Sequence, residues 1–314
     1  MIEIVIFSVG LAITAAGAVI FSKAAIRLAR LLKIKRIVIG ATVVSLATTA
    51  PETVVAVISS LANHSGLALG NALGSPVANI GLILGLVLLF GKVNFEKNVL
   101  RLSYLLIILT VFSFLVSFFQ KTINFVGGFL LILASLFYLW FLFKTQEEPA
   151  ELEPELEVIS VLKNFFQTLK LFFKLIFGLG LIIFGGFAII SGGVNLAKIL
   201  GASEIFIGLT LVAVGTSLPE LALAIASIFR KTISVSVGNL IGASVLTLTL
   251  TLGIAAVIIP VKVTSSVLII DFPAILAISL IFLLAQIWHF NHRILGASFL
   301  IFYLLYLAVL KIVG

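Results

Sequence analysis

The chain has 314 residues, of which 62% are hydrophobic and 10% charged, and its mean hydropathy is +1.34. Because soluble domains average about 25% charged residues, this composition excludes a soluble globular protein and predicts an all-α polytopic membrane protein. The net charge of +8 is interpreted as a topology signal and not as a nucleic-acid interface. The absence of cysteine excludes disulfides, thiolate metal sites and thiol catalysis.

Ten apolar runs have about the 20 residues that a membrane-spanning helix needs. The first run lacks a basic leader and a small-residue cleavage site, so no cleavable signal peptide is expected. The sequence therefore predicts ten transmembrane helices. They lie at roughly 4–22, 37–62, 67–90, 99–118, 123–143, 171–192, 205–229, 234–259, 264–285 and 295–312.

Only one join between these runs is long. Residues 144–163 contain the run EEPAELEPELE, which holds six of the twelve acidic residues. An acidic, proline-containing segment without aromatic residues is typical of a solvated linker or a short acidic helix, with calcium sensing as the alternative. We therefore divide the chain into a first five-helix repeat (1–143), this acidic linker (144–163) and a second five-helix repeat (164–314).

Lysine and arginine predict the orientation of the helices. Sixteen of the twenty lie in or beside the joins that follow the first, third, fifth, seventh and ninth runs. Cytoplasmic loops carry the excess of basic residues. We therefore expect a multi-pass protein of the cell membrane, with both termini outside and the acidic linker in the cytoplasm.

An internal repeat relates the two halves. Displaced by 168 residues, the segment of about 37–90 aligns with that of about 205–258. GATVVSLATTAPE, followed by GNALGSPVAN, matches GLTLVAVGTSLPE, followed by GNLIGASVLT. Five helices per half is an odd number, so the halves enter the membrane with opposite polarity. Inverted repeats of this kind are typical of secondary transporters that bind their substrates near the midplane.

Two acidic residues, Glu52 and Glu220, occupy matched and deep positions in this repeat, whereas Asp271 lies alone in the ninth apolar run. A charge at the centre of a spanning helix costs roughly 2.5–3.5 kcal/mol and normally serves function. Each glutamate follows a proline, which frees the carbonyl group four residues earlier. These carbonyls, the carboxylates and nearby hydroxyls make an oxygen-only set that suits Ca²⁺; the hydroxyls belong to Thr48, Thr49, Thr216 and Ser217.

Simpler interpretations exist for several of these residues. One proline–glutamate pair can be a kink with an idle acid, but two pairs in matched frames favour an ion site. Asn71 and Asn239 are suited to bonding freed backbone groups between helices. The remaining candidates are interpreted as interfacial side chains near helix ends and not as metal ligands: His64, His289, His292, Trp140 and Trp288.

The paired segments resemble the α-repeats of the sodium/calcium exchanger family, within the cation/calcium exchanger superfamily. The resemblance rests on TSLPE at 216–220 with GNLIG at 238–242, and on TTAPE at 48–52 with GNALGS at 70–75. Within this family, the chain resembles a prokaryotic-type member, which has two α-repeats and no large regulatory loop. It implies an ion cluster between helices 2, 3, 7 and 8, and a long tilted pair, helices 1 and 6, that slides to alternate access.

The resemblance also implies roles for individual residues. Glu52 and Glu220 would be the principal carboxylate ligands, and oxygens of Thr48 and Thr216 would complete the divalent site. Flanking sodium sites would use Thr49, Ser217 and Ser75, backbone carbonyls near Ser45 and Ala213, and Asn79 as the polar residue of helix 3. The chain departs from the family pattern at Ala243, usually Ser, and at Thr247, usually Asp, which removes one hydroxyl and a third carboxyl group from the cluster.

The expected function is therefore secondary antiport of Ca²⁺ against Na⁺ by alternating access, with the ions competing for the cluster around Glu52 and Glu220. Such a protein is no enzyme and needs no cofactor; its partners are the transported ions and the lipid bilayer, and it is expected to be a monomer. An H⁺/Ca²⁺ antiporter that uses the same glutamates as proton carriers remains an alternative. A cation channel and an intramembrane protease are weaker alternatives.

Overall fold

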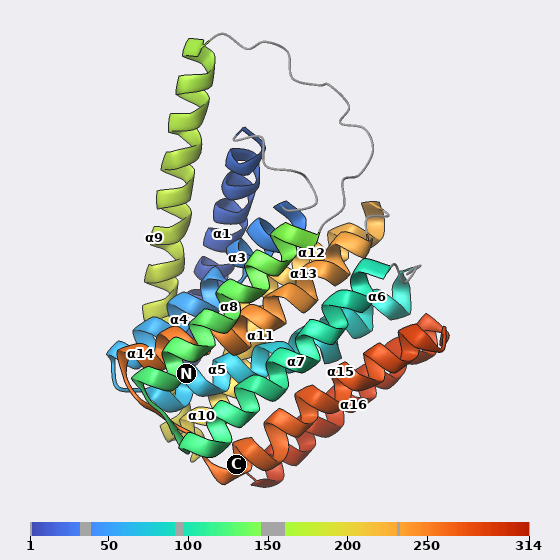
Figure 1. The fold of residues 1–314 in the computed structure, drawn as a ribbon. Helices are drawn as coiled ribbons and strands as arrows, with labels where there is room; N and C mark the ends of the chain where they lie inside the picture. The colour runs from blue at the N-terminus through green and yellow to red at the C-terminus, as the bar shows by residue number, and fades with distance from the viewer. Residues whose placement is uncertain (1, 32–38, 92–96, 146–160, 231–232, 314) are drawn as a thin grey trace.

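The computed structural model describes residues 2–31, 39–91, 97–145, 161–230 and 233–313. These residues form a bundle of helices (Figure 1), and two short antiparallel strands, β1 (Thr122–Ile123) and β2 (Val261–Lys262), are the only strands in this part of the chain. Eight helical runs are long and apolar enough to cross a membrane, and two bent pairs raise the number in the described ranges to ten. The prediction of ten membrane helices is confirmed.

The first half contains five spans in order. The first is α1 (Ile2–Leu31), and the second is bent, with η1 (Ile39–Val44), α3 (Ser45–Thr48) and α4 (Ala50–Leu61). The third comprises α5 (Ser65–Val77), η2 (Ala78–Leu84) and α6 (Gly85–Phe90). The fourth and fifth are α7 (Lys97–Gln120) and α8 (Phe125–Thr145). Here η marks a π-helical segment.

The second half also contains five spans in order, and its second and third spans carry π-helical segments as those of the first half do. It starts with α9 (Val161–Leu200), followed by the bent span α10 (Glu204–Ile207), η3 (Gly208–Val212), α11 (Ala213–Thr216) and α12 (Leu218–Arg230). The eighth span is α13 (Ile233–Leu246), η4 (Thr247–Thr251) and α14 (Leu252–Ile258). The last two spans are η5 (Val267–Asp271) with α15 (Phe272–Ile287), and α16 (His292–Val313).

The sixth span is longer than its apolar run. Helix α9 extends over 40 residues, starts within the segment that the sequence assigned to the linker, and projects beyond the rest of the bundle (Figure 1). Most of the acidic linker, including all six of its glutamates, lies outside the described residues.

The two spans that carry the proline–glutamate pairs are bent, as expected from prolines that free carbonyl groups of the helix. The helix axis turns by 44° between α3 and α4 and by 43° between α11 and α12. The residues at the breaks, Thr49 and Ser217, have ψ values of −3° and 8°. Pro51 and Pro219 follow two residues later, and because proline has no N–H group the backbone hydrogen-bond ladder is interrupted there. Each break lies three residues before a glutamate of the repeat.

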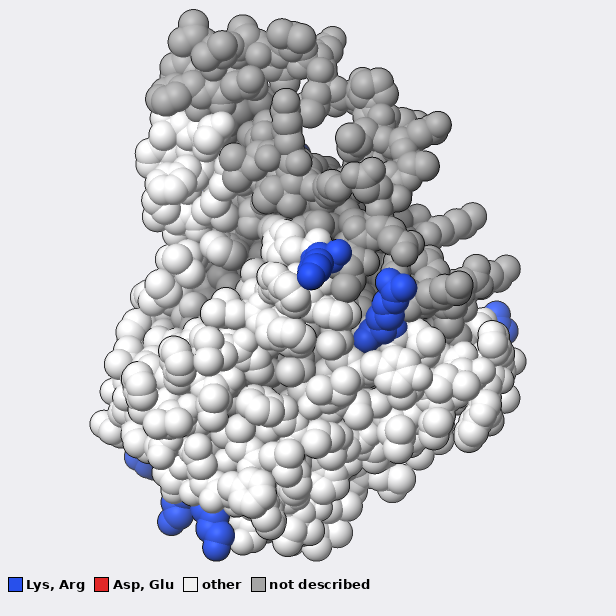
Figure 2. Space-filling model, in the orientation of Figure 1, with Lys and Arg blue, Asp and Glu red and all other residues white. Residues whose placement is uncertain are grey.

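The third and eighth spans form the centre of the bundle. Of their apolar windows 78% is buried, whereas the unbent outer spans reach at most 44%. Large apolar side chains are exposed on the outer helices, among them Phe137 on α8, Phe184 on α9 and Leu304 on α16. Figure 2 shows an uncharged band between two levels that carry lysine and arginine. An apolar surface of this extent fits lipid contact.

Helices α1 and α9 lie side by side at one edge of the bundle (Figure 1). Their contact is made through glycines, because an added Cβ atom at Gly10 would lie 3.0 Å from the carbonyl oxygen of Gly185, and one at Gly17 would lie 2.8 Å from that of Gly178. Small residues let helix backbones approach closely in membranes. The first helices of the two halves therefore form a tight pair.

Candidate ion-binding site

Glu52 and Glu220 lie in the first turns of α4 and α12, and both are almost completely buried. The hydroxyl group of Ser217, at the break of the second repeat, donates a hydrogen bond of 3.2 Å to Oε1 of Glu52. Oε2 of Glu52 and both carboxyl oxygens of Glu220 have no hydrogen-bond partner within the described ranges. Because an uncompensated buried carboxylate is strongly destabilising, this arrangement calls for bound cations or protons.

Two symmetry-related hydrogen bonds connect the repeats beside these glutamates. The hydroxyl of Thr48 lies 3.4 Å from Oδ1 of Asn239, and that of Thr216 lies 3.0 Å from Oδ1 of Asn71. Asn71 also donates through Nδ2 to the backbone carbonyl of Glu52 at 2.9 Å. Asn71 thus has the interhelical bonding role that the sequence predicted for it, and Asn239 is linked across the repeats through Thr48.

The hydroxyl groups at the two breaks differ in their contacts. Thr49 donates to the carbonyl oxygen of Ser45 at 2.6 Å, whereas its counterpart Ser217 donates to Glu52. The carbonyl oxygen of Ala213 accepts from the backbone N–H of Ser217 at 3.2 Å. The carboxylate of Glu52 is therefore supported by a hydroxyl at the break of the other repeat, while the carboxylate of Glu220 has no corresponding hydrogen bond within the described part of the chain.

A second asymmetry concerns the centre of the third and eighth spans. Oγ of Ser75 and both side-chain polar atoms of Asn79 are fully buried and have no hydrogen-bond partner in the part of the chain that is described. At the matched positions, Ala243 has no side-chain oxygen, and the Thr247 hydroxyl donates to the carbonyls of Ala243 and Ser244, both at 3.0 Å. The first repeat therefore offers more uncommitted polar atoms than the second.

The structure thus places all eleven residues proposed from the sequence on the two broken spans and the two central spans, and all are buried. The hydroxyl groups of Thr48 and Thr49 both donate to the carbonyl oxygen of Ser45, and that of Ser217 donates to Glu52. Thr216 is linked to Glu52 through Asn71. Ser75, Asn79 and Thr247 are on the adjoining central spans, without a side-chain hydrogen bond to either glutamate among the described contacts.

Close backbone packing brings these segments together. A Cβ atom added to Gly208 would lie 2.7 Å from the carbonyl oxygen of Leu67 and 2.9 Å from Cα of Gly70. One added to Gly74 would lie 2.7 Å from Cβ of Ala213. Helix α5 of the first repeat therefore touches η3 and α11 of the second repeat at backbone distance, which holds the third span against the broken span of the other half.

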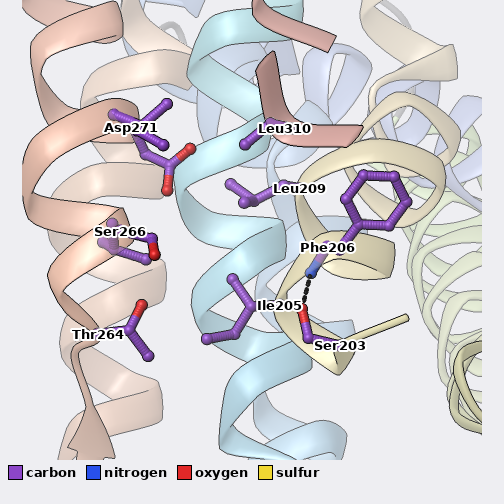
Figure 3. Close-up of a pocket in the computed structure, with 10 residues that line it drawn as sticks. Ser203, Ile205, Phe206, Leu209, Thr264, Ser266, Asp271 and Leu310 are labelled. Carbon is purple, nitrogen blue, oxygen red and sulfur yellow. Dashed lines mark hydrogen bonds between the residues drawn. The ribbon is translucent and has the colours of Figure 1, made fainter. Parts of the chain in front are cut away.

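A third buried acid lies outside this cluster. Asp271 ends η5, is 1% exposed, and accepts a hydrogen bond of 2.7 Å from the Tyr306 hydroxyl. It lines a cavity of about 240 Å³ together with Ser203, Thr264 and Ser266 (Figure 3). The sequence indicated that Asp271 lies in an apolar run, but it did not predict that the acid would be as buried as the paired glutamates. Its position matches Ser103 in the first half, so it has no acidic counterpart.

The histidines remain near helix ends, but two of them have partners that the sequence did not predict. Nδ1 of His64 lies 2.8 Å from Oε1 of Glu204, and Nδ1 of His292 lies 3.0 Å from the carbonyl oxygen of Leu88. No group of three or more His, Cys, Asp or Glu side chains capable of holding a metal occurs in the described ranges. Any divalent ion at the central cluster must therefore take most of its ligands from carbonyls, hydroxyls and amides.

Fold and site together define a multi-pass helical membrane protein whose two halves meet at a buried acidic centre lined by oxygen atoms. A family model described as sodium/calcium exchanger protein matches residues 2–144 and 170–311. The chain therefore belongs to the sodium/calcium exchanger family, as the resemblance of its repeats implied. This family consists of exchangers, which are transporters and not enzymes.

Individual proteins show the same relationship. The inner membrane protein YrbG of Escherichia coli K12 is 33% identical over 82% of this chain and 80% of its own. A sodium/calcium exchanger of Methanosarcina acetivorans is 28% identical over 98% of both chains. A solved structure of the sodium-calcium exchanger NCX_Mj, soaked with Na⁺ and Sr²⁺, has a TM-score of 0.71 and 26% identity over 98% of both chains.

Proposed function

We propose that this protein is a secondary antiporter that exchanges Ca²⁺ for Na⁺ across the membrane. The single observation that carries the proposal is the buried pair Glu52 and Glu220 at the meeting point of two inverted repeats, with three carboxyl oxygens that have no hydrogen-bond partner among the described residues. Two carboxylates supply a charge of −2, which one Ca²⁺ or two Na⁺ neutralise. The family description and the name of the Methanosarcina acetivorans relative both mention sodium and calcium, which supports this choice of exchanged ions.

The proposed ligand set contains only oxygen atoms, as hard cations require. Glu52 and Glu220 would hold Ca²⁺ together with oxygens of Thr48 and Thr216, whose positions beside the breaks support this role. Na⁺ would use the same carboxylates and the flanking oxygens. These flanking groups are the side chains of Thr49, Ser217, Ser75, Asn79 and Thr247 and the backbone carbonyls near Ser45 and Ala213.

Exchange would follow from competition for the same charge. An empty cluster with two ionised carboxylates resists closure because it would bury two uncompensated charges. Ca²⁺ or Na⁺ removes this cost, so only the loaded protein occludes and reopens on the other side. The pair of α1 and α9 would move along the remaining helices, and its position at the edge of the bundle supports this division.

We also propose that the protein works as a monomer in the cell membrane, because each chain carries both halves of the cluster. Both termini would lie outside and the acidic linker in the cytoplasm. The support for this orientation is that sixteen of the twenty basic residues lie in or beside the joins that follow the odd-numbered spans.

A second candidate is H⁺/Ca²⁺ exchange through the same glutamates. It is favoured by one specific observation, the lack of a free side-chain oxygen at Ala243 and Thr247. Fewer neutral oxygens weaken Na⁺ binding, whereas protons need only the two carboxylates. The coupling ion separates the two candidates.

The test is uptake of ⁴⁵Ca²⁺ into proteoliposomes that are preloaded with Na⁺, or are acidic inside without Na⁺. We expect Na⁺-driven uptake in the wild type and its loss in both Glu52→Gln and Glu220→Gln, because each glutamine removes one of the two charges. Asp271→Asn is the matched control, since it neutralises a buried acid outside the cluster and should leave uptake intact.

The other outcomes each point elsewhere. Uptake driven by the pH gradient alone would replace Na⁺ with H⁺ as the coupling ion. Uptake that needs neither gradient would overturn antiport and indicate a channel. Retention of exchange in both glutamine variants would remove the glutamate pair from the mechanism.

A further inference from the structure

Tyr138 carries an unexplained buried hydroxyl. It lies in α8, outside the two repeat segments, and its side chain is completely buried. Its hydroxyl group has no hydrogen-bond partner among the residues that the structure describes. Buried polar groups nearly always have a partner, so an orphaned hydroxyl requires a specific reason, such as an ion or water that binds there.

The Tyr138 hydroxyl points toward the central cluster. Gly242 on α13 has no side chain, and the space where its Cβ atom would lie is bounded by Oγ of Ser45 at 2.5 Å and by Oη of Tyr138 at 3.1 Å. Two hydroxyl oxygens from α3 and α8 therefore converge over one glycine of the second repeat. Any larger residue at position 242 would displace one of them.

This pair of hydroxyls is continuous with the proposed ion ligands. The carbonyl oxygen of Ser45 accepts a hydrogen bond from the Thr49 hydroxyl. The hydroxyl of Ser45 lies 3.5 Å from the carbonyl oxygen of Asn239, and Asn239 precedes Gly242 by about one helical turn. Asn239 in turn accepts from Thr48. Tyr138 is thus next to Ser45, on the side of the cluster where α3 packs against Gly242 of α13.

We propose that the Tyr138 hydroxyl is a ligand of a monovalent cation on this side of the cluster, together with Oγ of Ser45. The two groups that converge here, Tyr138 Oη and Ser45 Oγ, are neutral, so they suit Na⁺ and leave Ca²⁺ to the two carboxylates. A lone pair of the phenol oxygen faces the ion, and no proton is transferred. This inference rests on the proposed exchange of Ca²⁺ for Na⁺.

The test compares Tyr138→Phe with the wild type in proteoliposomes. Phenylalanine keeps the ring and removes only the hydroxyl. We expect the Na⁺ concentration for half-maximal ⁴⁵Ca²⁺ uptake to rise about tenfold, which corresponds to about 1.4 kcal/mol. Exchange of Ca²⁺ for Ca²⁺ without Na⁺ should stay within about twofold of the wild-type rate, because the carboxylates are unchanged.

Tyr303→Phe is the matched control. Tyr303 on α16 is also buried and has a hydroxyl without a described partner, but its ring packs against Gly81 and not against Ser45. The Na⁺ dependence of this variant should equal that of the wild type. A second variant, Ser45→Ala, removes the opposing hydroxyl and should weaken Na⁺ dependence selectively even if Tyr138→Phe does not fold.

Failure of this inference is distinguishable from failure of the proposed function. If Na⁺ drives uptake in the wild type but has the same half-maximal concentration in Tyr138→Phe and Ser45→Ala, the hydroxyl is only a packing feature and the inference is overturned. An equal shift in Tyr303→Phe would overturn it too, as would parallel losses of Na⁺- and Ca²⁺-driven exchange. If wild-type uptake does not respond to Na⁺, the proposed coupling itself fails.

Discussion

Asp271 and the paired glutamates illustrate how differently three buried carboxylates can be surrounded. Asp271 has a dedicated donor in Tyr306, whereas Glu220 has no hydrogen-bond partner among the described residues. A carboxylate with a protein donor at 2.7 Å is suited to a fixed structural contact. Carboxyl oxygens without a protein donor are suited to a ligand that binds and dissociates reversibly.

This contrast predicts opposite outcomes for two substitutions at position 271. In Asp271→Asn the amide oxygen still accepts from the Tyr306 hydroxyl, so thermal stability and exchange should remain close to wild type. In Asp271→Ala the buried hydroxyl loses its acceptor, which should lower the free energy of unfolding by about 1–3 kcal/mol. Thermal unfolding in detergent measures both. A folded Asp271→Asn protein without exchange would instead place Asp271 in the transport path.

Residue-level sequence reasoning identified the glutamates because they recur in matched Thr-x-x-Pro-Glu frames. It did not predict the contact between Asp271 and Tyr306, because the two side chains meet only through the packing of η5 against α16. The same limit applies to Thr247, whose hydroxyl could face the cluster as judged from its position but bonds its own helix. The rotamer of such a side chain depends on which residues of other helices surround it, and the pattern of residues along the sequence does not specify them.

At the scale of the elements, backbone contact between α5 and η3 holds the third span of the first half against the broken span of the second half. Gly70 and Gly208 lie so close that neither has room for a side chain. The sequence showed both glycines as a matched pair, but it did not distinguish those that set a close approach from those in open positions. It also did not predict the π-helical segments, which are a feature of the packed spans.

Gly208→Ala tests this contact. Its Cβ atom would lie 2.7 Å from the backbone oxygen of Leu67 and 2.9 Å from Cα of Gly70, so backbone would have to move. We expect a loss of about 1–3 kcal/mol in unfolding free energy, as for other overpacked cores, and a marked loss of exchange because the breaks separate. Gly180→Ala in α9 is the control, since nothing lies within 4 Å of its added Cβ atom. Equal behaviour of the two variants would refute the packing argument.

For the whole molecule, the 168-residue displacement in the sequence corresponds to a physical repetition. The π-helical segments of the second and third spans and the breaks at Thr49 and Ser217 recur in the same order in both halves, whereas η5 has no counterpart among the described residues of the first half. The number of spans was predictable because each needs an apolar run of sufficient length. The arrangement of spans around α5 and α13 was not, since it depends on which small residues lie opposite one another in space.

The proposed motion of α1 and α9 against the other helices can be tested by a reversible cross-link. Gly186 of α9 faces α4, and an added Cβ atom there would lie 3.6 Å from Cγ1 of Val54. The cysteine sulfur of Val54→Cys would take the place of a Cγ atom, so Val54→Cys/Gly186→Cys is the pair chosen for the cross-link. Because the natural chain has no cysteine, the introduced pair is the only thiol source.

We expect oxidised Val54→Cys/Gly186→Cys to retain ion binding but to lose exchange, because a disulfide prevents α9 from moving past α4. Reduction with dithiothreitol should restore ⁴⁵Ca²⁺ uptake in the same proteoliposomes, so that the reduced protein serves as its own control. Binding is measured separately as Ca²⁺-induced thermal stabilisation of the oxidised protein, which should persist because Glu52 and Glu220 are unchanged. Full exchange in the oxidised state would mean that α9 and α4 move as one body, and that access alternates by another displacement.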